Sequence, residues 1–335
     1  MILVTGGTGL VGAHLLLRLL QDNASVRAIY REGSNLRQVE TVFSYYTEKS
    51  SQLFDQIEWV PADINDIPAL EIAFEDVDYV YHAAALISFD PKDYHRLKKT
   101  NALGTANIVN LCLSNAIKKL CYVSTIGAIG KSAEGQIATE ENEWSSQEAN
   151  VYGLTKYRAE MEVWRGSQEG LDVVIVNPGI ILGPGFWETG SGTLFTIAHE
   201  AKNYYPPGGT GFITVNDVVR MMVELMASNI VNQRFIAVAE NLSYKEILTR
   251  MAIPLGKKAP SKKLRLWQLR LGRLFDYLKS HLIGSKRKLT KKAIDSFLHP
   301  ETYDNQKIVA ALDFEFEPLE ATLVFCCEKF KEENP

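Results

Sequence analysis

The sequence predicts an α/β protein: a Rossmann-type, doubly wound parallel sheet with a smaller, partly interleaved C-terminal substrate lobe. Short apolar runs alternate with amphipathic stretches of helical period up to residue 182, and a glycine-rich turn follows the first run. This alternation is typical of a parallel sheet that helices cover on both faces. We therefore expect a dinucleotide-binding Rossmann domain at 1–182 and a mainly substrate-binding lobe at 183–335, some segments of which return to the first domain.

Hydrophobic periodicity and breaker residues place the individual elements. Strands are expected where short apolar runs lie between turn signals, at 2–4, 25–30, 57–62, 78–82, 120–124 and 173–177. Helices are expected where apolar residues recur every three or four positions, at 11–21, 69–74, 101–115 and 152–168. Glycine and proline clusters punctuate the chain beyond residue 183, and the remainder is expected to form helices with a few short strands.

The composition of the 335-residue chain is that of an ordinary globular protein, 46% hydrophobic and 23% charged. A net charge of -4 argues against a nucleic-acid binder. No apolar run reaches the roughly 18 residues of a membrane span and no signal peptide is recognised, so we expect a cytoplasmic protein. The four cysteines form no CxxC and are expected to be reduced, and the six histidines show no metal-ligand spacing.

The turn after the first strand carries the fingerprint of a dinucleotide site, although a purely structural glycine turn is the alternative. Gly7, Gly9 and Gly12 fit GxGxxG between an expected strand and an expected helix, and Gly6 adds a glycine in front. Glycine permits a sharp turn, close approach of a pyrophosphate and tight helix–sheet packing. The free N–H groups at the start of the helix attract the phosphates. The predicted contacts are Gly6, Thr8, Gly9, Leu10, Val11 and Gly12.

Arg31, at the end of the second expected strand, indicates NADP as the cofactor. An NAD enzyme usually has Asp or Glu there to accept from the ribose hydroxyls, whereas Arg binds a 2′-phosphate with two charge-assisted hydrogen bonds. Glu32 follows directly and could pair with Arg31 or accept from a ribose, so NAD is kept as the alternative. Asp63 follows the third strand, where it could accept from an adenine amino group or cap the next helix.

Tyr152 and Lys156 form the predicted proton-transfer pair. They are four residues apart, which places both side chains on one face of an expected helix. A phenol has a pKa near ~10, and a cation one turn away lowers it by stabilising the phenolate. Ser124 and Thr125 stand at the end of a strand, where doubly wound sheets bind ligands. A hydroxyl there can hold a substrate carbonyl, although such a pair also forms turns.

Together these motifs resemble those of the extended short-chain dehydrogenase/reductase family, over nearly the whole chain. The matching motifs are TGxxGxxG at 5–12, HxAA at 82–85, NxxGT at 101–105, YxxxK at 152–156, NPxxxxGP at 177–184 and DxxKxxxxLG at 304–313. Asp313 departs from the last of these, where glycine is common, and the departure is expected to affect only a terminal turn.

The resemblance implies a role for each matching residue. Tyr152 would be the general acid in the reducing direction, and Lys156 would lower its pKa and bind the nicotinamide ribose. Thr125 matches the catalytic Ser/Thr position better than Ser124, and Asn101 would be a supporting, water-relaying residue. For Asp63 the resemblance favours ligand binding over helix capping. It gives His82, the first residue of the HxAA motif, a structural role. The implied cofactor contacts are Asp63, Ile64, Ala83, Ala84, Ala85, Tyr152, Lys156, Pro178, Gly179 and Ile181.

The stretch 174–184 resembles the carbonyl-reductase branch of the family, which includes dihydroflavonol reductases, cinnamoyl-CoA reductases and 3β-hydroxysteroid dehydrogenases. Nucleotide-sugar epimerases and dehydratases typically have an NVYGP-like stretch there and an acid after the second strand, and this chain has neither. We therefore expect an NADP-dependent enzyme that reduces an aldehyde or ketone, or oxidises the matching alcohol. A sugar-nucleotide epimerase or dehydratase with tightly bound NAD, and a non-catalytic NADP-binding sensor, are the alternatives.

A basic segment at 257–292 interleaves Lys and Arg with Trp267, Leu271, Leu274 and Leu278. One interpretation is an amphipathic helix that faces a membrane. The other, which we favour, is a solvated helix whose apolar side covers the substrate pocket. Apart from a small-molecule substrate, the resemblance also implies a homodimer, formed through the helices expected at 101–115 and 152–168.

Overall fold

The computed structural model describes residues 1–132, 136–283, 287 and 289–334. Its centre is a seven-stranded sheet in the order β10-β6-β5-β4-β1-β2-β3, and every pairing in it is parallel. The strands are β1 (Ile2–Thr5), β2 (Val26–Tyr30), β3 (Glu58–Pro61), β4 (Tyr79–His82), β5 (Lys119–Val123), β6 (Val173–Pro178) and β10 (Gln233–Ala237). The order reverses at β1, so a crevice opens between β1 and β4 at the carboxyl ends of the strands.

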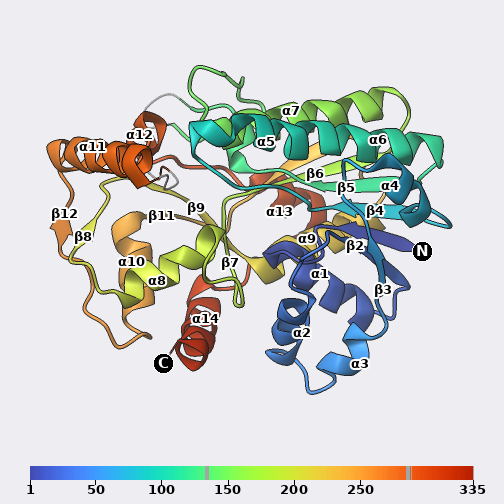
Figure 1. Ribbon diagram of the computed structural model, residues 1–335, viewed down its shortest axis with the longest axis horizontal. Helices are drawn as coiled ribbons and strands as arrows, with labels where there is room; N and C mark the ends of the chain where they lie inside the picture. Colours follow the sequence, from blue (N-terminus) through green and yellow to red (C-terminus); the bar gives the residue numbers. More distant parts are fainter. Residues whose placement is uncertain (133–135, 284–286, 288, 335) are drawn as a thin grey trace.

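Helices cover both faces of this sheet (Figure 1). One face packs on α1 (Leu10–Gln21) and α9 (Val215–Ala227), and the other on α4 (Ile67–Ala73), α6 (Gly104–Ser114) and α7 (Val151–Gln168). Buried residues along a strand alternate between the two cores: in β5, Leu120 and Tyr122 face one, and Cys121 and Val123 face the other. This period of two on a doubly buried sheet explains why the strands read as continuous apolar runs.

All the expected strands and helices up to residue 182 occur within a few residues of the predicted bounds. Three of the described α-helices up to residue 182 were not predicted: α2 (Leu36–Ser44), α3 (Ser50–Phe54) and the short α5 (Tyr94–Leu97). In α2 the buried Val39, Val42 and Phe43 do recur at helical spacing, so a local signal was missed there, whereas α3 and α5 are too short to show one. The helix expected at 101–115 begins as a π-helical turn, Lys98–Leu103, which continues from the short helix α5 (Tyr94–Leu97) into α6.

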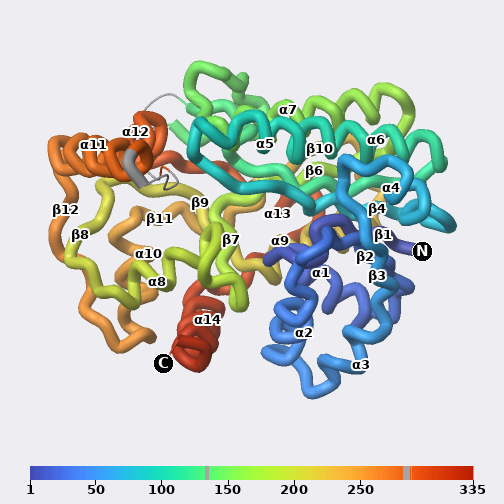
Figure 2. Tube along the Cα trace, in the orientation of Figure 1, coloured from blue at the N-terminus to red at the C-terminus, as the bar shows by residue number. Residues whose placement is uncertain are grey.

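Segments from beyond residue 183 complete the parallel sheet. Strand β10 pairs in parallel with β6, and helix α13 (Gln306–Leu312) lies beside β10, where the Lys307 ammonium is over the Phe235 ring. Figure 2 shows α13, near the end of the chain, at the middle of the molecule. Asp313 ends α13 with φ 50°, a left-handed conformation that suits glycine better than aspartate.

The rest of the C-terminal part forms a second lobe, on the left in Figure 1. A three-stranded sheet, β11-β9-β7, packs with three helices around a separate apolar core that includes Trp187, Phe195 and Phe330. Among the described residues, no helix has both the length and the apolar character needed to span a membrane. The elements of the lobe are β7 (Ile180–Leu182), α8 (Thr193–His199), β8 (Tyr204–Tyr205), β9 (Gly209–Thr214), β11 (Glu240–Ser243), α10 (Tyr244–Ala252), β12 (Lys262–Lys263), α11 (Leu266–Ile283), α12 (Lys291–Leu298) and α14 (Leu319–Glu333).

A buried lysine joins the central sheet to the returning helix α9, which suggests a stability test. Lys119 on β5 donates from Nζ to the carbonyls of Leu225 and Ser228 at the end of α9, at 2.6 and 2.9 Å, and burial lowers its pKa. Lys119→Met leaves both carbonyls without this donor and is expected to lower the free energy of unfolding by about 1–3 kcal/mol. The measurement is urea unfolding followed by circular dichroism.

The matched control is the neighbouring residue, Lys118, whose side chain is 62% exposed and pairs with Asp78 at the surface. Lys118→Met should change the free energy of unfolding by less than about 0.5 kcal/mol because exposed ion pairs contribute little. Equal effects of the two substitutions would show that the Lys119 bonds do not stabilise the junction.

Candidate active site

The glycine turn after β1 is built so tightly that side chains are excluded from it. Gly6 has φ +74°, and a Cβ there would lie 2.6 Å from the Ala84 nitrogen in the segment after β4. A Cβ at Gly12, on the first turn of α1, would lie 2.1 Å from the Gly6 carbonyl oxygen. The backbones of the turn, of α1 and of the β4 segment therefore meet without side chains between them, as dinucleotide binding requires.

Helix α1 begins at Leu10 without a side-chain cap. Its N-cap is Gly9, with φ -107° and ψ 175°, and no side chain accepts from the first N–H groups. The positive end of the helix dipole thus meets the crevice with donors available for a pyrophosphate. The open helix start and the closely packed glycines of the turn fit a dinucleotide.

A pocket of about 550 Å³ lies at the carboxyl ends of β2 and β3. Its lining includes Arg31, Glu32 and Ser34 from the end of β2 and Ala62, Asp63 and Asp66 from the end of β3. The pocket is where the crevice beside β1 places the adenosine end of a dinucleotide. Arg31 and Glu32 are both exposed there, so cation and acid border the same pocket.

Asp63 does not cap the next helix. Its Oδ1 accepts from the backbone and side-chain nitrogens of Asn65, each at 2.8 Å, and Asp66 is the residue whose side chain caps α4. Its neighbour Ile64 is buried against Gly104, and its carbonyl accepts from Asn107. Of the two readings of Asp63, the capping role is therefore excluded, and the carboxylate stays at the pocket wall.

The ammonium of Lys156 is buried at the end of β5. It donates to the Tyr122 hydroxyl at 2.6 Å and to the Val123 carbonyl at 2.7 Å, and it also lies over the Tyr122 ring. Burial lowers the pKa of Lys156 to about 7, and Glu160, one turn further along α7, opposes that shift. Burial and the nearby Glu160 and Tyr152 raise the pKa of Tyr122, so its hydroxyl stays protonated.

Tyr152 lies in the first turn of α7, which the Asn150 side chain caps. Burial raises the pKa of the Tyr152 phenol, which is opposite to the lowering by Lys156 that the sequence predicts. The physical reason is that desolvation disfavours the phenolate, while the Lys156 ammonium is held by Tyr122 and Val123. The Phe89 ring meets Tyr152 edge-on with centroids 5.8 Å apart.

Asn101 holds the loop after β4 against α7. Its side-chain oxygen accepts from the Leu86 nitrogen at 2.7 Å, and its Nδ2 donates to the Leu86 carbonyl and to the Thr155 hydroxyl. The residue is buried within the π-helical turn, a geometry often found at functional sites. These contacts give Asn101 a positioning role next to the Tyr152–Lys156 turn.

His82 is a structural residue at the end of β4. It is fully buried and bridges the Thr5 hydroxyl, 2.6 Å from Nδ1, and the Thr105 hydroxyl, 2.9 Å from Nε2. Burial lowers its pKa to about 3, so the ring is neutral. The Ala84 nitrogen donates to the same Thr5 hydroxyl, which fixes the segment Ala83–Ala85 along the crevice beside the glycine turn.

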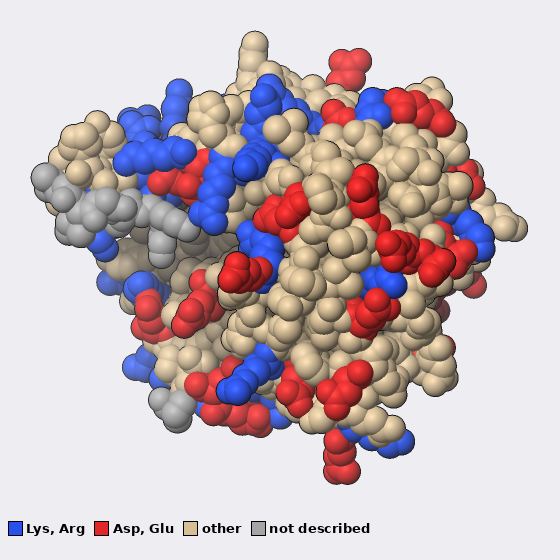
Figure 3. Space-filling model, turned by 45° about the vertical axis from the view of Figure 1, so that its right-hand side comes forward, with Lys and Arg blue, Asp and Glu red and all other residues tan. Residues whose placement is uncertain are grey.

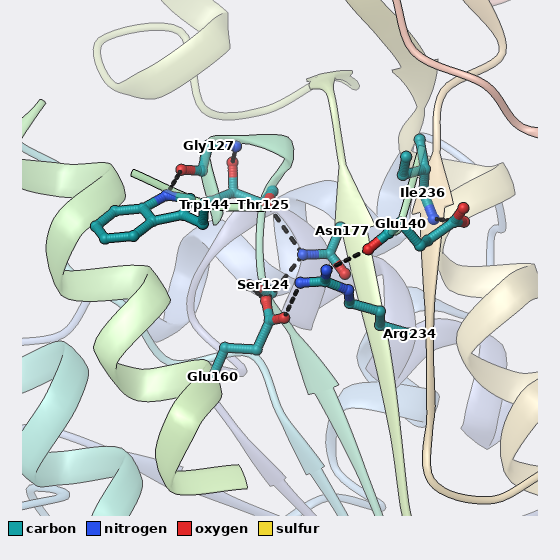
Figure 4. Close-up of polar contacts among 9 residues, drawn as sticks. All are labelled: Ser124, Thr125, Gly127, Glu140, Trp144, Glu160, Asn177, Arg234 and Ile236. Atoms are coloured by element: carbon teal, nitrogen blue, oxygen red, sulfur yellow. Dashed lines mark hydrogen bonds and ion pairs between the residues drawn. The ribbon is translucent and has the colours of Figure 1, made fainter. Parts of the chain in front are cut away.

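Ser124 and Thr125 have different surroundings, as Figure 4 shows. The Ser124 hydroxyl is buried and donates to Glu160 Oε2 at 2.6 Å. Thr125 Oγ1 accepts only from the Gly127 nitrogen, at 3.2 Å, so its proton has no acceptor among the described residues. Thr125 is therefore the hydroxyl that can donate to a ligand. A Cβ at Gly153 would lie 3.0 Å from the Gly127 carbonyl, so the start of α7 touches this turn.

Glu160 is the centre of a buried network that sequence reasoning missed. Besides Ser124, it accepts from Asn177 at 2.9 Å and from Arg234 on β10 at 3.0 Å (Figure 4). Arg234 also donates to the Glu140 carbonyl, and the Glu140 carboxylate accepts from the Ile236 nitrogen at 2.8 Å. The network joins α7, β5, β6 and β10, so no local pattern could have revealed it. Tyr122 and Phe89 were missed for the same reason.

The predicted contacts after β6 lie at the transition to the second lobe. Pro178 ends β6, and the Gly179 nitrogen donates to the Ala237 carbonyl at 3.0 Å. A Cβ at Gly179 would lie 2.4 Å from the Gly211 carbonyl, so the two backbones touch. Ile181 follows on β7, where its carbonyl accepts from Ser191.

Two glycines of the turn allow packing and ligand binding to be separated. Gly12→Ala forces the Gly6 carbonyl away and is expected to destabilise the fold by about 1–3 kcal/mol. Gly9→Ala meets its nearest atom at 3.4 Å in a backbone conformation open to any residue, so stability should be unchanged, but the methyl group faces the open helix start. Urea unfolding and a dinucleotide titration measure the two effects. If Gly9→Ala bound the dinucleotide normally, the phosphates would not lie at this turn.

The comparisons with known proteins agree with this geometry. A putative dihydroflavonol 4-reductase of Synechocystis sp. is 31% identical over 274 residues, which are 79% of this chain and 75% of the relative. Sterol demethylase protein B of Methylococcus capsulatus is 28% identical over 253 residues, 73% of this chain and 72% of the relative. The crystal structure of gox2253 covers 99% of this chain and 98% of its own, with a TM-score of 0.82 and 24% identity, and so shows the same fold.

The profile of the NAD dependent epimerase/dehydratase family matches residues 2–239. That range includes every strand of the parallel sheet, the glycine turn and the Tyr152–Lys156 pair. The chain therefore belongs to this family of extended short-chain dehydrogenases/reductases and is an NAD(P)-dependent oxidoreductase.

Proposed function

We propose that this protein is an NADP-dependent reductase of aldehydes or ketones, which also oxidises the matching alcohols. The observation that carries the proposal is the pair of hydroxyls at the end of the crevice: the protonated phenol of Tyr152 and the Thr125 hydroxyl, whose proton has no acceptor among the described residues. Both lie where α7 touches the turn after β5. We infer from this backbone contact that the two hydroxyls face the same part of the crevice, where two donors would suit a carbonyl oxygen that gains negative charge.

A bound reduced nicotinamide would supply the hydride for the carbonyl carbon. Tyr152 Oη donates its proton to the carbonyl oxygen, which becomes the alcohol hydroxyl, and Thr125 Oγ1 donates a hydrogen bond to the same oxygen. The raised pKa of Tyr152 keeps the phenol protonated before the reaction. Lys156, held at the end of β5 by Tyr122 and Val123, provides the positive charge that stabilises the phenolate left behind.

Residues at both ends of the crevice would hold the cofactor. The glycine turn and Thr8 to Val11 would bind the pyrophosphate, Arg31 the 2′-phosphate, and Asp63 and Ile64 the adenine. Lys156 would also contact the nicotinamide ribose, and Ala83 to Ala85, Pro178, Gly179 and Ile181 would line the path of the cofactor. The exposed guanidinium in the pocket at the end of β2 supports NADP over NAD.

The substrate is proposed to be apolar around its carbonyl group. Phe89 packs edge-on against Tyr152 and is 45% exposed, and Ile87 on the same loop is 53% exposed, so the approach to Tyr152 has an apolar border. The relatives' names point the same way, since they refer to a dihydroflavonol and to a sterol. A nucleotide-sugar epimerase would instead need polar groups for the diphosphate and sugar.

Replacing the proposed acid tests the reaction. Tyr152→Phe is expected to lower kcat for carbonyl reduction by about 10²–10⁴-fold because the proton donor is lost, while NADPH binding stays near normal. NADPH absorbance is followed with a panel of aromatic and alicyclic aldehydes and ketones. Tyr157→Phe is the control, because Tyr157 stacks on Trp144 on another face of α7. If the unaltered protein isomerised a UDP- or GDP-sugar without net NADPH loss, the protein would be an epimerase instead. If it bound NADPH but turned over neither carbonyl compounds nor sugar nucleotides, it would be a non-catalytic sensor.

Replacing Arg31 tests the cofactor. The unaltered protein should bind NADPH at least about tenfold more tightly than NADH, or about 1.4 kcal/mol. Arg31→Ala should remove that preference and leave NADH binding unchanged, because only the 2′-phosphate loses its partner. Nicotinamide fluorescence titrations at fixed salt measure both constants, with the nearby Arg37→Ala as control. A preference for NADH in the unaltered protein would indicate instead that Glu32 accepts from the hydroxyls of the adenosine ribose.

The pH dependence of the reaction follows from Lys156. Its buried ammonium is charged below a pKa of about 7 and neutral above it. If the charge stabilises the phenolate, kcat/KM for reduction should fall as the pH rises through about 7. Profiles are measured from about pH 5.5 to about pH 9.5 in the unaltered protein and in Lys156→Arg, whose guanidinium stays charged and should show a lower but level profile. A level profile in the unaltered protein would contradict the role given to Lys156.

A further inference from the structure

Helix α11 (Leu266–Ile283) presents its apolar side chains to solvent. Trp267, Leu271, Leu274, Phe275 and Leu278 are 59%, 44%, 52%, 62% and 44% exposed. Their spacing of i, i+4, i+7, i+8 and i+11 places them on one face of the helix, a stripe about 100° wide. This corrects the favoured interpretation of the sequence, in which the apolar side of this segment covers the substrate pocket.

The face of α11 that packs against the rest of the protein carries mostly small or polar side chains. Leu269 and Ser280 are buried among the described side chains of α11, and a Cβ at Gly272 would lie 3.2 Å from the Leu289 side chain. Asp276 accepts from the Leu289 nitrogen at 3.0 Å. Hydrogen bonds, the buried Leu269 and the Leu289 side chain against Gly272 therefore attach the helix to the protein. Its polarity is the reverse of that of a helix that covers a core.

Positive charge surrounds the apolar stripe. Residues 257–292 contain 13 Lys and Arg against one Asp, in a chain whose net charge is -4. Arg270 and Lys279 are both exposed, and helical geometry places them on opposite flanks of the stripe. In Figure 3, Lys and Arg side chains gather at the upper left, at the end of the molecule where Figure 1 shows α11 and α12.

We propose that α11 binds the surface of an anionic lipid bilayer, with Trp267, Leu271, Leu274, Phe275 and Leu278 inserted among the acyl chains and the flanking cations at the headgroups. An apolar face with basic flanks is the combination that interfacial helices use. A second copy of the chain fits this surface poorly, because pairing the stripe with itself would bring two dense sets of positive charge together. Lipid headgroups supply the opposite charge.

The contacts of α11 connect this surface with the catalytic region. The Lys92 ammonium donates to the Ser280 hydroxyl of α11 at 3.2 Å, and the backbone nitrogen of Arg287, which follows the helix, donates to Asp90 Oδ2 at 2.8 Å. Asp90 and Lys92 belong to the loop that carries Phe89 against Tyr152. If the proposed function holds, a docked α11 therefore sets the apolar border of the crevice close to the bilayer, from which a lipophilic carbonyl compound can enter.

Vesicle sedimentation with the full-length protein tests the docking without any substrate, so its outcome is independent of the proposed reaction. The protein should sediment with vesicles of about 30% phosphatidylglycerol in phosphatidylcholine, and at least about tenfold less with phosphatidylcholine alone. Binding should weaken as salt rises from about 0.1 to about 1 M. Tryptophan emission should shift to shorter wavelength on binding, and this shift should be lost in Trp267→Phe.

Two double variants separate the apolar and the electrostatic contributions. Trp267→Gln/Phe275→Gln and Arg270→Glu/Lys279→Glu change exposed side chains only, so both should fold normally and bind anionic vesicles at least about tenfold more weakly. Ile72→Gln is the matched control, since Ile72 is 60% exposed on α4, a helix of the Rossmann domain, and should change nothing.

Three outcomes would overturn the proposal. One is failure of the unaltered protein to sediment with the anionic vesicles. Another is binding that both double variants retain. The third is a concentration-dependent dimer, seen by analytical ultracentrifugation without vesicle binding, that Trp267→Gln/Phe275→Gln abolishes; this result would assign the stripe to a second copy of the chain.

Discussion

Two charged side chains buried one turn apart on α7, Lys156 and Glu160, hold this helix to the parallel sheet. Lys156 donates to the Tyr122 hydroxyl and the Val123 carbonyl, and Glu160 accepts from Ser124, Asn177 and Arg234. Burying charges costs free energy that their hydrogen bonds only partly offset. Stability alone therefore does not explain why this pair is buried. Its hydrogen bonds do explain why the first turn of α7, which contains Tyr152, meets the end of β5.

The same contacts also determine which of two adjacent hydroxyl side chains, Ser124 or Thr125, keeps a proton that is free to donate. Glu160 engages the Ser124 hydroxyl and leaves the Thr125 hydroxyl free of any acceptor among the described residues. The carbonyl at the end of β5 engages the Lys156 ammonium, and Asn101 uses both ends of its amide on Leu86 and Thr155. Each of these contacts orders one part of the crevice wall, and the proposed function assigns the Tyr152 and Thr125 hydroxyls to the substrate.

The sheet strands and the glycine turn depend on local sequence pattern, and both were predicted from the sequence. Alternating apolar runs indicated the sheet, and the glycine motif indicated a turn in which the structure leaves no room for a side chain at Gly6 or Gly12. Contacts between distant segments were beyond reach: the Glu160 network joins four elements, and the partners of Lys156 lie more than 30 positions earlier in the chain. The direction of the Tyr152 pKa shift depends on burial, and the orientation of α11 depends on which side its polar anchors face, so spacing alone could predict neither.

The central claim is that hydride passes from the cofactor to a substrate carbonyl, with net reduction. The most direct test follows deuterium from NADPH that carries deuterium at both hydrogen positions of nicotinamide C4 into the product by mass spectrometry. The account predicts that one deuterium appears on the new carbinol carbon for each NADPH consumed. A product that is an isomer of its substrate, with no net consumption of cofactor and no deuterium gained, would contradict it and place the protein among the epimerases.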